Sequence, residues 1–124
     1  MKSQWYEFLI KTAGEGVQLQ PSKIHGTGVF ATKPFGIGDK IGLVLEQTVN
    51  NPMEIVYQRT PVLGLYLNHQ GAFSNAHLEK LGDNWYLFAH MYIAEGDEIT
   101  VDYDRYYKQL TLEFEITNKS VRVS

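Results

Sequence analysis

The sequence contains no cysteine, which excludes disulfide bonds, cysteine-ligated zinc and a thiol nucleophile. It also contains no run of basic residues: the eleven lysines and arginines are scattered, fourteen acidic residues outnumber them, and the net charge is −3. Because no global basic field attracts phosphates, direct nucleic-acid binding is not expected. No apolar stretch approaches the length of a membrane span, and the N-terminal residues lack the apolar core of a signal peptide. These absences predict a soluble, intracellular protein with no membrane partner.

The residues that are present describe one mostly β domain. A chain of 124 residues is long enough for one hydrophobic core and too short for two, so residues 1–124 are expected to form a single domain. Hydrophobic residues make up 44% of the sequence, which excludes a largely disordered chain. Eleven glycines and several short β-patterned runs predict strands joined by tight turns.

Strands are predicted where apolar residues alternate or cluster between turn residues. The sequence Gly82-Asp83-Asn84 is typical of the tight turn of a hairpin, because such residues accept positive φ angles. A last core strand carries Ile99 and Val101 and runs directly into Tyr103. The other predicted strands are Val17–Pro21, a short strand after the glycine turn within Ser22–Ala31, Lys40–Glu46, and the hairpin arms within Asn75–Leu81 and Trp85–Tyr92.

Three stretches are harder to interpret. Residues 4–11 fit a helix or a strand equally well because the span is short. Residues 52–67 suggest one or two short helical turns in an irregular connection. In the tail, apolar and polar residues alternate strictly over residues 110–117, which predicts a strand and not a helix, and a second strand should follow the turn at Asn118-Lys119. This C-terminal strand extension, residues 108–124, needs a sheet to join, either in its own chain or in a second copy, as a homodimer.

Several familiar kinds of site do not fit the sequence. The turn Gly26-Thr27-Gly28 lacks the third glycine and the following helix of a dinucleotide-binding loop, although its glycines can let the backbone approach a ligand closely. No serine has the context of a nucleophile elbow. A metal site is not expected, because no histidine pair has a zinc-ligand spacing; the four histidines are His25, His69, His77 and His90.

Three motifs occur in a fixed order along the chain: His25–Ala31 (HGTGVFA), Asn68-His69, and Gly96–Tyr103 (GDEITVDY). In this order the sequence resembles the SET domain of the protein-lysine methyltransferases, with its glycine loop, its Asn-His motif and its final tyrosine motif. In size it is similar to the minimal SET domains of viruses and bacteria. The resemblance covers about residues 17–107, and Tyr103, Tyr106 and Tyr107 follow the last motif's strand as a cluster of phenols.

The resemblance implies a β-clip fold of small curled sheets, with a knot-like core and one or two short helices. It also implies S-adenosylmethionine as the cofactor and a lysine of a histone or another protein as the methyl acceptor. In this reading Tyr103 is the catalytic phenol. The cofactor would be held by the backbone of His25, Gly26, Thr27 and Gly28, by Asn68 and the backbone of His69, and by Tyr106 or Tyr107 packing on its adenine.

The sequence departs from the family pattern around the acceptor channel. Gln70 stands where the family usually has serine. Family members often place channel tyrosines at two regions that here hold Val44 and Leu45, and His77 and Leu78. Two other readings therefore stay open: a SET-like module that binds a cofactor or a protein without turnover, and an unrelated small β domain whose glycines are turns and whose tyrosines are core.

Overall fold

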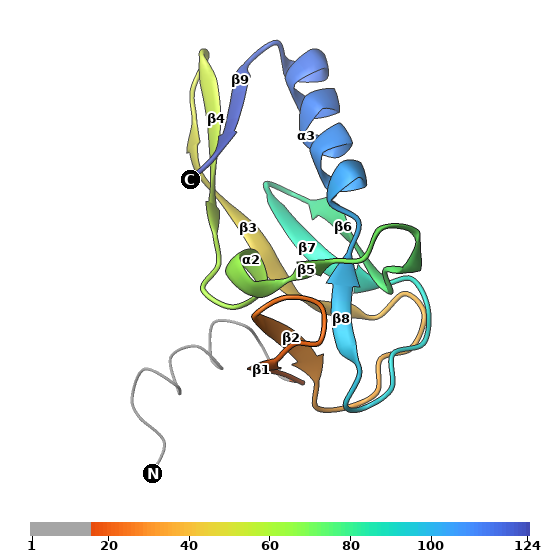
Figure 1. The fold of residues 1–124 in the computed structure, drawn as a ribbon. Coiled ribbons are helices and arrows are strands. Elements are labelled where there is room, and N and C mark those ends of the chain that lie inside the picture. The colour runs from red at the N-terminus through yellow and green to blue at the C-terminus, as the bar shows by residue number, and fades with distance from the viewer. Residues whose placement is uncertain (1–15) are drawn as a thin grey trace.

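The computed structural model describes residues 16–124, so the ambiguous residues 4–11 lie outside the described part of the chain. The described chain forms two sheets (Figure 1). The four-stranded sheet has the order β1-β2-β8-β5 and the five-stranded sheet the order β6-β7-β3-β4-β9. Their strands are β1 Val17–Pro21, β2 Thr27–Ala31, β3 Lys40–Asn50, β4 Glu54–Arg59, β5 Asn68–His69, β6 Ala76–Leu81, β7 Asn84–Ala89, β8 Glu98–Val101 and β9 Ser120–Val123.

Three helical segments complete the described chain. The helix α2 covers Leu63–Tyr66, a 3-10 turn covers Gly71–Phe73, and α3 covers Tyr103–Thr117. The mostly β prediction is therefore confirmed. Among residues 16–124, no helix combines the length and the apolar character needed to cross a membrane.

The four-stranded sheet brings distant motifs together. β8 pairs antiparallel with β2, which follows the glycine turn, and parallel with β5 on its other edge. In the parallel pair Asn68 lies opposite Thr100, and His69 lies opposite Val101. The backbone N–H of Gln70 then donates to the carbonyl of Val101 at 3.0 Å. This pairing confirms that the last motif lies beside Asn68-His69, as the resemblance implies.

The five-stranded sheet contains both the predicted hairpin and a strand that the sequence pattern did not predict. β6 and β7 pair across the turn at Gly82, which has a φ of 62°. The prediction of short helical turns in an irregular connection over residues 52–67 was partly wrong. Only Leu63–Tyr66 is helical, whereas Glu54–Arg59 forms β4 between β3 and β9. Its run Ile55-Val56-Tyr57 is buried on both faces of the sheet and holds no charged residue, and this removes the alternation that identifies an exposed strand.

The predicted strand over residues 110–117 was wrong, because these residues belong to α3. The side chain of Asp102 caps the helix by accepting from the backbone N–H of Asp104 at 3.0 Å, and Asn118 ends it in a left-handed conformation with a φ of 55°. Only the short β9 after this turn is a strand. It pairs parallel with β4 of the same chain, so the strand pairing that suggested a second copy is satisfied internally.

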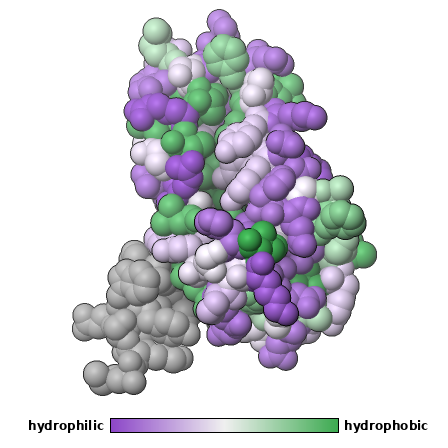
Figure 2. Space-filling model, in the orientation of Figure 1, coloured by the Kyte–Doolittle hydropathy of each residue, from purple (hydrophilic) through white to green (hydrophobic). Residues whose placement is uncertain are grey.

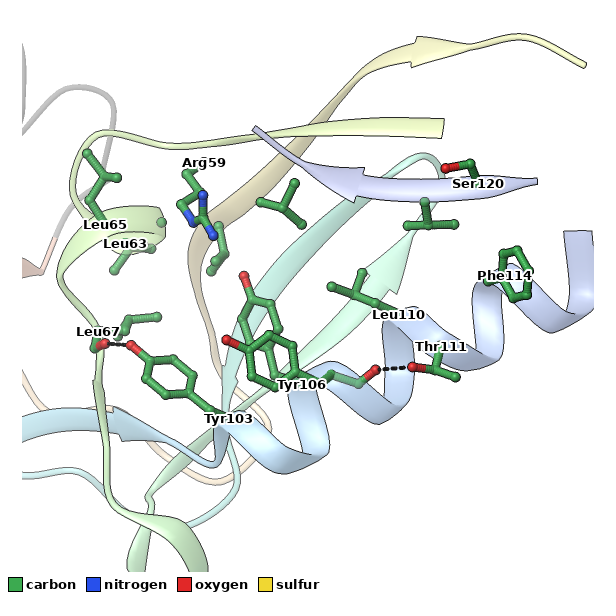
Figure 3. A pocket seen from close by; sticks show the side chains of 15 residues that line it. Arg59, Leu63, Leu65, Leu67, Tyr103, Tyr106, Leu110, Thr111, Phe114 and Ser120 are labelled. Carbon is green, nitrogen blue, oxygen red and sulfur yellow. Dashed lines mark hydrogen bonds between the residues drawn. The ribbon is translucent and has the colours of Figure 1, made fainter. Parts of the chain in front are cut away.

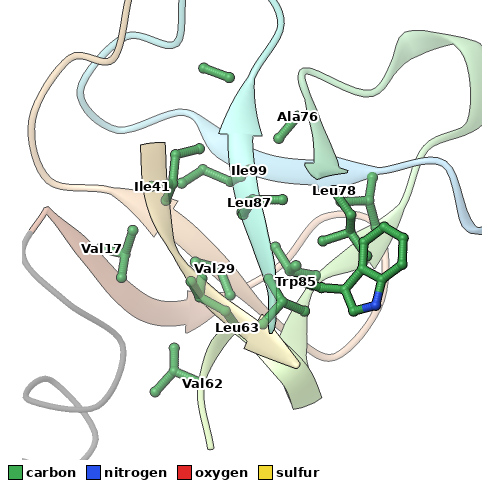
Figure 4. Close-up of a cluster of buried hydrophobic side chains, with 14 of the residues drawn as sticks. Val17, Val29, Ile41, Val62, Leu63, Ala76, Leu78, Trp85, Leu87 and Ile99 are labelled. Carbon is green, nitrogen blue, oxygen red and sulfur yellow. The ribbon is translucent and has the colours of Figure 1, made fainter. Parts of the chain in front are cut away.

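One cluster of buried side chains connects the two sheets (Figure 4). Val29 and Ile99 enter it from the first sheet, and Leu45 and Leu87 enter it from the second, all fully buried. Burial of this apolar area is the main force that holds the two sheets together. The site described next lies where strands from both sheets end.

Candidate functional site

Tyr103 lies where β8 ends and α3 begins, and two contacts from His69 fix it. The backbone N–H of Tyr103 donates to Nδ1 of His69 at 2.9 Å. The two rings also stack, with centroids 5.4 Å apart and an angle of 16° between their planes. Since Nδ1 accepts this hydrogen bond, the neutral imidazole carries its proton on Nε2. His69 therefore positions Tyr103 in two ways: its Nδ1 accepts a hydrogen bond from the Tyr103 backbone, and its ring stacks on the Tyr103 ring.

The hydroxyl of Tyr103 donates a hydrogen bond to the backbone carbonyl of Leu67, the residue before Asn68. Burial raises the pKa of the Tyr103 phenol above its ordinary value; nearby Tyr107 adds to the rise and the positive charge of Arg59 opposes it. The phenol is therefore neutral at physiological pH. Because its proton is engaged by Leu67, its oxygen presents lone pairs to any group that approaches it.

Asn68 connects this position to the glycine turn. Its Nδ2 donates to the carbonyl of His25 at 3.0 Å, to that of Thr27 at 3.5 Å and to Oε2 of Glu98 at 2.8 Å. The other oxygen of the Glu98 carboxylate accepts from Oγ of Ser22 at 2.7 Å. The site therefore has a polar side made of carbonyl and carboxylate oxygens. Glu98 was not among the predicted site residues; the sequence signal for it is an acidic residue opening a strand that is otherwise buried.

Gly28 allows the close approach of these groups. A Cβ atom at this position would lie 2.3 Å from Oε2 of Glu98 and 3.1 Å from Nδ2 of Asn68. The first distance is far below van der Waals contact, so only glycine fits without displacement of the carboxylate. Gly26 is required for a different reason, because its φ of 45° lies in the left-handed region.

The side chain of Asn75 is hydrogen-bonded to the backbone of β8. Its Nδ2 donates to the carbonyl of Glu98 at 2.8 Å, and its Oδ1 accepts from the backbone N–H of Thr100 at 2.9 Å. Thr100 is fully buried, and its hydroxyl donates to Oε1 of Gln70 at 3.1 Å. Through this bond Gln70 helps to hold β8 in place behind the site.

A cavity of about 770 Å³ opens on the other side of Tyr103, between α2, α3 and β9 (Figure 3). Its wall is mainly apolar and aromatic. Tyr106 and Tyr107 lie in this wall with ring centroids 6.1 and 6.5 Å from that of Tyr103. The lining residues are Val44, Arg59, Leu63, Gly64, Leu65, Leu67, Tyr103, Tyr106, Tyr107, Leu110, Thr111, Phe114, Ser120, Val121 and Val123.

The four residues predicted for the acceptor channel are separated in the structure. Val44 lines the large cavity together with Tyr103. Leu45 is fully buried in the core and lines neither cavity described here. His77 and Leu78 line a smaller cavity of about 200 Å³, whose wall also includes Tyr106. Within residues 16–124, no group of three or more histidine or acidic side chains converges on a metal site.

No family model matches the sequence, and no curated protein matches it. Solved structures match the fold. The methyltransferase domain of human PR domain-containing protein 2 aligns with a TM-score of 0.57 and 23% identity over 77% of this chain and 81% of that chain. The SET domain of the RIZ1 tumour suppressor (PRDM2) aligns with the same TM-score and identity over 79% of this chain and 75% of that chain.

A third similar structure is a Plasmodium falciparum protein provisionally assigned as a histone methyltransferase. It aligns with a TM-score of 0.52 and 19% identity over 73% of this chain and 94% of that chain. At these identities the comparisons establish the fold, which is that of a SET domain, and they confirm the predicted β-clip architecture. The expected closeness to viral and bacterial domains stays a prediction.

Proposed function

We propose that this chain, which has the fold of SET-domain methyltransferases, transfers a methyl group from S-adenosylmethionine to the side-chain amine of a lysine in a protein. The observation that carries the proposal is the path of contacts from Tyr103 through Leu67 and Asn68 to the carbonyls of His25 and Thr27. Three segments that are far apart in sequence meet there, between a polar side and an apolar cavity. Such a meeting point suits a small cationic cofactor on one side and an alkyl amine on the other.

The polar side fits the proposed cofactor in its chemistry. S-adenosylmethionine supplies a methyl group on a cationic sulfur and also carries an ammonium group. Carbonyl and carboxylate oxygens, here those of His25, Thr27 and Glu98, are the groups that stabilise such charges. We assign cofactor binding to residues 25–28, Asn68 and the backbone of His69. The chain's remaining contribution is alignment and electrostatics, because transfer from sulfur to nitrogen needs no nucleophile on the protein.

Tyr103 would orient the acceptor amine. Since its hydroxyl proton is donated to Leu67, the phenolic oxygen can accept an N–H of the amine and so direct the nitrogen lone pair away from itself. The amine must be neutral, although the ordinary pKa of lysine is about 10.4. The apolar wall of the cavity disfavours the ammonium form through desolvation. Tyr106 and Tyr107 present aromatic faces that suit a methylated ammonium product.

A second candidate is a SET-like module that binds a cofactor or a protein without turnover. The observation that favours it is Val44, an aliphatic residue in the cavity wall where many members of the family have a channel tyrosine. Calorimetry with S-adenosylmethionine, followed by mass spectrometry of a lysate incubated with the protein and an isotopically labelled donor, separates the two. Labelled lysines support the enzyme, and binding without label supports the module. The absence of both S-adenosylmethionine binding and labelled lysines would contradict the enzyme and the cofactor-binding form of the module.

Replacing Gly28 with alanine is expected to weaken S-adenosylmethionine binding by about tenfold or more, because the new Cβ displaces the Glu98 carboxylate and the Asn68 amide. Calorimetry gives the dissociation constant directly. Gly36→Ala is the matched control, because Gly36, like Gly28, does not have a left-handed φ, and its added Cβ would meet only Oδ2 of Asp39 at an ordinary 3.6 Å. Equal affinities in the two variants would remove the glycine turn from cofactor binding.

The rate of transfer is expected to rise with pH up to about pH 10, because the acceptor lysine deprotonates over this range. Burial raises the pKa of Tyr103, so its neutral form persists above the ordinary tyrosine range and the phenol should not limit the rate below about pH 10. The measurement is kcat/KM against pH, with circular dichroism showing that the protein stays folded. A fall in kcat/KM between about pH 8 and 9.5 in folded protein would contradict the expected direction of the Tyr103 shift.

A further inference from the structure

The large cavity carries a single formal charge. Of its fifteen lining residues in the described chain, only Arg59 is charged, and the others are aliphatic, aromatic or small. Arg59 is the last residue of β4, and Figure 3 shows its guanidinium extending from the strand toward the tyrosine rings. A cation in the cavity that receives a lysine is unexpected, because like charges repel.

The guanidinium of Arg59 makes no hydrogen bond or ion pair to any side chain or carbonyl in residues 16–124. Arg122 on the neighbouring strand differs, since its Nε lies 3.4 Å from Oε2 of Glu54. Arg59 is exposed, so water satisfies its five donors at little cost. These donors are therefore available to a ligand at the mouth of the cavity.

The cavity is larger than a lysine side chain requires. Its volume of about 770 Å³ lies in the range of pockets that enclose whole small-molecule ligands, about 300–1,000 Å³. Four methylenes and an amine that reach Tyr103 leave much of the wall uncovered. The exposed apolar residues nearby, Leu65 and Phe114, extend this wall outward. In Figure 2 apolar residues reach the surface among polar ones in the upper half of the view, where α3, β4 and β9 lie. The cavity therefore has room for residues next to the acceptor lysine.

We propose that Arg59 is a specificity residue that binds a carboxylate close to the acceptor lysine, so that the preferred substrates are proteins with acidic residues flanking the target. The inference rests on the proposed function of this site. A guanidinium pairs with a carboxylate through two parallel hydrogen bonds, which gives direction as well as charge complementarity. A basic tail would instead place further cations against Arg59. The site thus selects against the basic tails that a histone substrate would offer.

The test uses amidated peptides that share one lysine and differ only in the residues within three positions on either side, which are glutamate, glutamine or arginine. With the wild-type protein we expect kcat/KM to be about tenfold higher for the glutamate peptide than for the glutamine peptide, and lowest for the arginine peptide. Arg59→Gln should remove the advantage of glutamate, so that the glutamate and glutamine peptides have similar kcat/KM values. Arg59→Glu should reverse the order, so that the arginine peptide becomes the best substrate.

Three controls identify the cause. Arg122→Gln removes the same charge from β9, whose Val121 and Val123 line the cavity while Arg122 does not, and it should keep the preference. Arg59→Lys keeps the charge but not the planar guanidinium, so it should keep part of the preference for the glutamate peptide. A glutamine peptide with a free C-terminal carboxylate next to the lysine separates the two sources of the group: preference for it over its amidated form assigns the site to chain ends, and preference for glutamate alone assigns it to acidic side chains.

Binding of the same peptides, measured by fluorescence anisotropy, makes the inference independent of turnover. A glutamate preference in binding that depends on Arg59, without methyl transfer to any peptide, would overturn the proposed function and support the carboxylate site. Methyl transfer with equal kcat/KM for the three peptides would support the proposed function and overturn the carboxylate site. A uniform loss of kcat for all peptides in Arg59→Gln would also overturn it, because that pattern indicates an effect on the tyrosines.

Discussion

Tyr103→Phe is expected to lower the rate of methyl transfer about a hundredfold while the affinity for S-adenosylmethionine stays within about twofold. The substitution removes one oxygen and keeps the ring that stacks on His69. The backbone N–H of residue 103 keeps its bond to Nδ1 of His69, so the start of α3 should not move. The lost group is the oxygen that would accept an N–H of the amine, which acts on the acceptor and not on the cofactor. Single-turnover rates and calorimetry measure the two quantities separately.

Two measurements show whether the loss is local. Removal of the bond to the Leu67 carbonyl should cost about 0.5–1.5 kcal/mol of unfolding free energy, so Tm should fall by a few degrees and the protein should stay folded at the assay temperature. Tyr92→Phe, which changes an exposed phenol outside both cavity walls, should leave the rate unchanged. A Tyr103→Phe protein that transfers methyl groups at the wild-type rate would remove the phenol from the reaction.

Glu113→Ala is expected to lower the free energy of unfolding by about 3 kcal/mol. Glu113 is the buried residue of α3, with only 6% of its side chain exposed. Its Oε1 accepts from the hydroxyl of Tyr57 and from Nζ of Lys80, both at 2.5 Å, and so ties the helix to two strands of the five-stranded sheet. Burial alone would lower the pKa of Lys80, but its bonds to Glu113 and Tyr57 outweigh this and raise the pKa. Truncation leaves the fully buried Tyr57 hydroxyl and the Lys80 ammonium without this partner, and urea unfolding measures the cost.

The expected loss of stability lies at the lower end of the range for broken buried ion pairs, because the Lys80 side chain is 33% exposed. Glu115→Ala is the control, since it removes an exposed carboxylate from the same helix and should change stability by less than about 0.5 kcal/mol. Glu113→Gln retains an acceptor for Tyr57 and should lie between the two. Equal stabilities of the Glu113→Ala and Glu115→Ala proteins would show that the network does not hold the helix.

The tail shows why alternation alone can mislead. Apolar residues alternate over Leu110–Ile116, yet the side chains that turn inward follow a helical spacing: Tyr106, Leu110, Glu113 and Thr117. Two members of the alternating set, Leu112 and Ile116, stay 54% and 75% exposed. The inward position in the middle of the helix holds a glutamate, so the pattern hid the buried face. Asp102 and Asn118, which cap the helix, are residue types typical of helix ends, and the strand prediction did not take them into account.

Motifs that depend on local backbone demands were predictable, and features created by tertiary contacts were not. The glycine turn and the hairpin at Gly82 require particular residues at particular φ angles, so short patterns identify them. The roles of the Glu98 carboxylate and the Arg59 guanidinium depend on residues that lie next to them only in the folded sheets. Short sequence patterns therefore do not identify them. Likewise Leu45 was expected near the acceptor because it lies in a region where SET domains often have a channel tyrosine, but its side chain enters the core while that of its neighbour Val44 reaches the cavity.

α3 is anchored in a different sheet at each end. It starts at Tyr103, where β8 ends, and it leads through Asn118 into β9. Ser124, which follows β9, accepts a backbone hydrogen bond from Arg59 and donates one to Tyr57. Fifteen helical residues make a rod of roughly 22 Å between those anchors. Mechanical load applied after Ser124 therefore reaches Tyr57 and Arg59 on β4 directly through these backbone bonds. Because Val123 lines the same cavity as Tyr103, a cargo or affinity handle fused there begins next to the wall of that cavity.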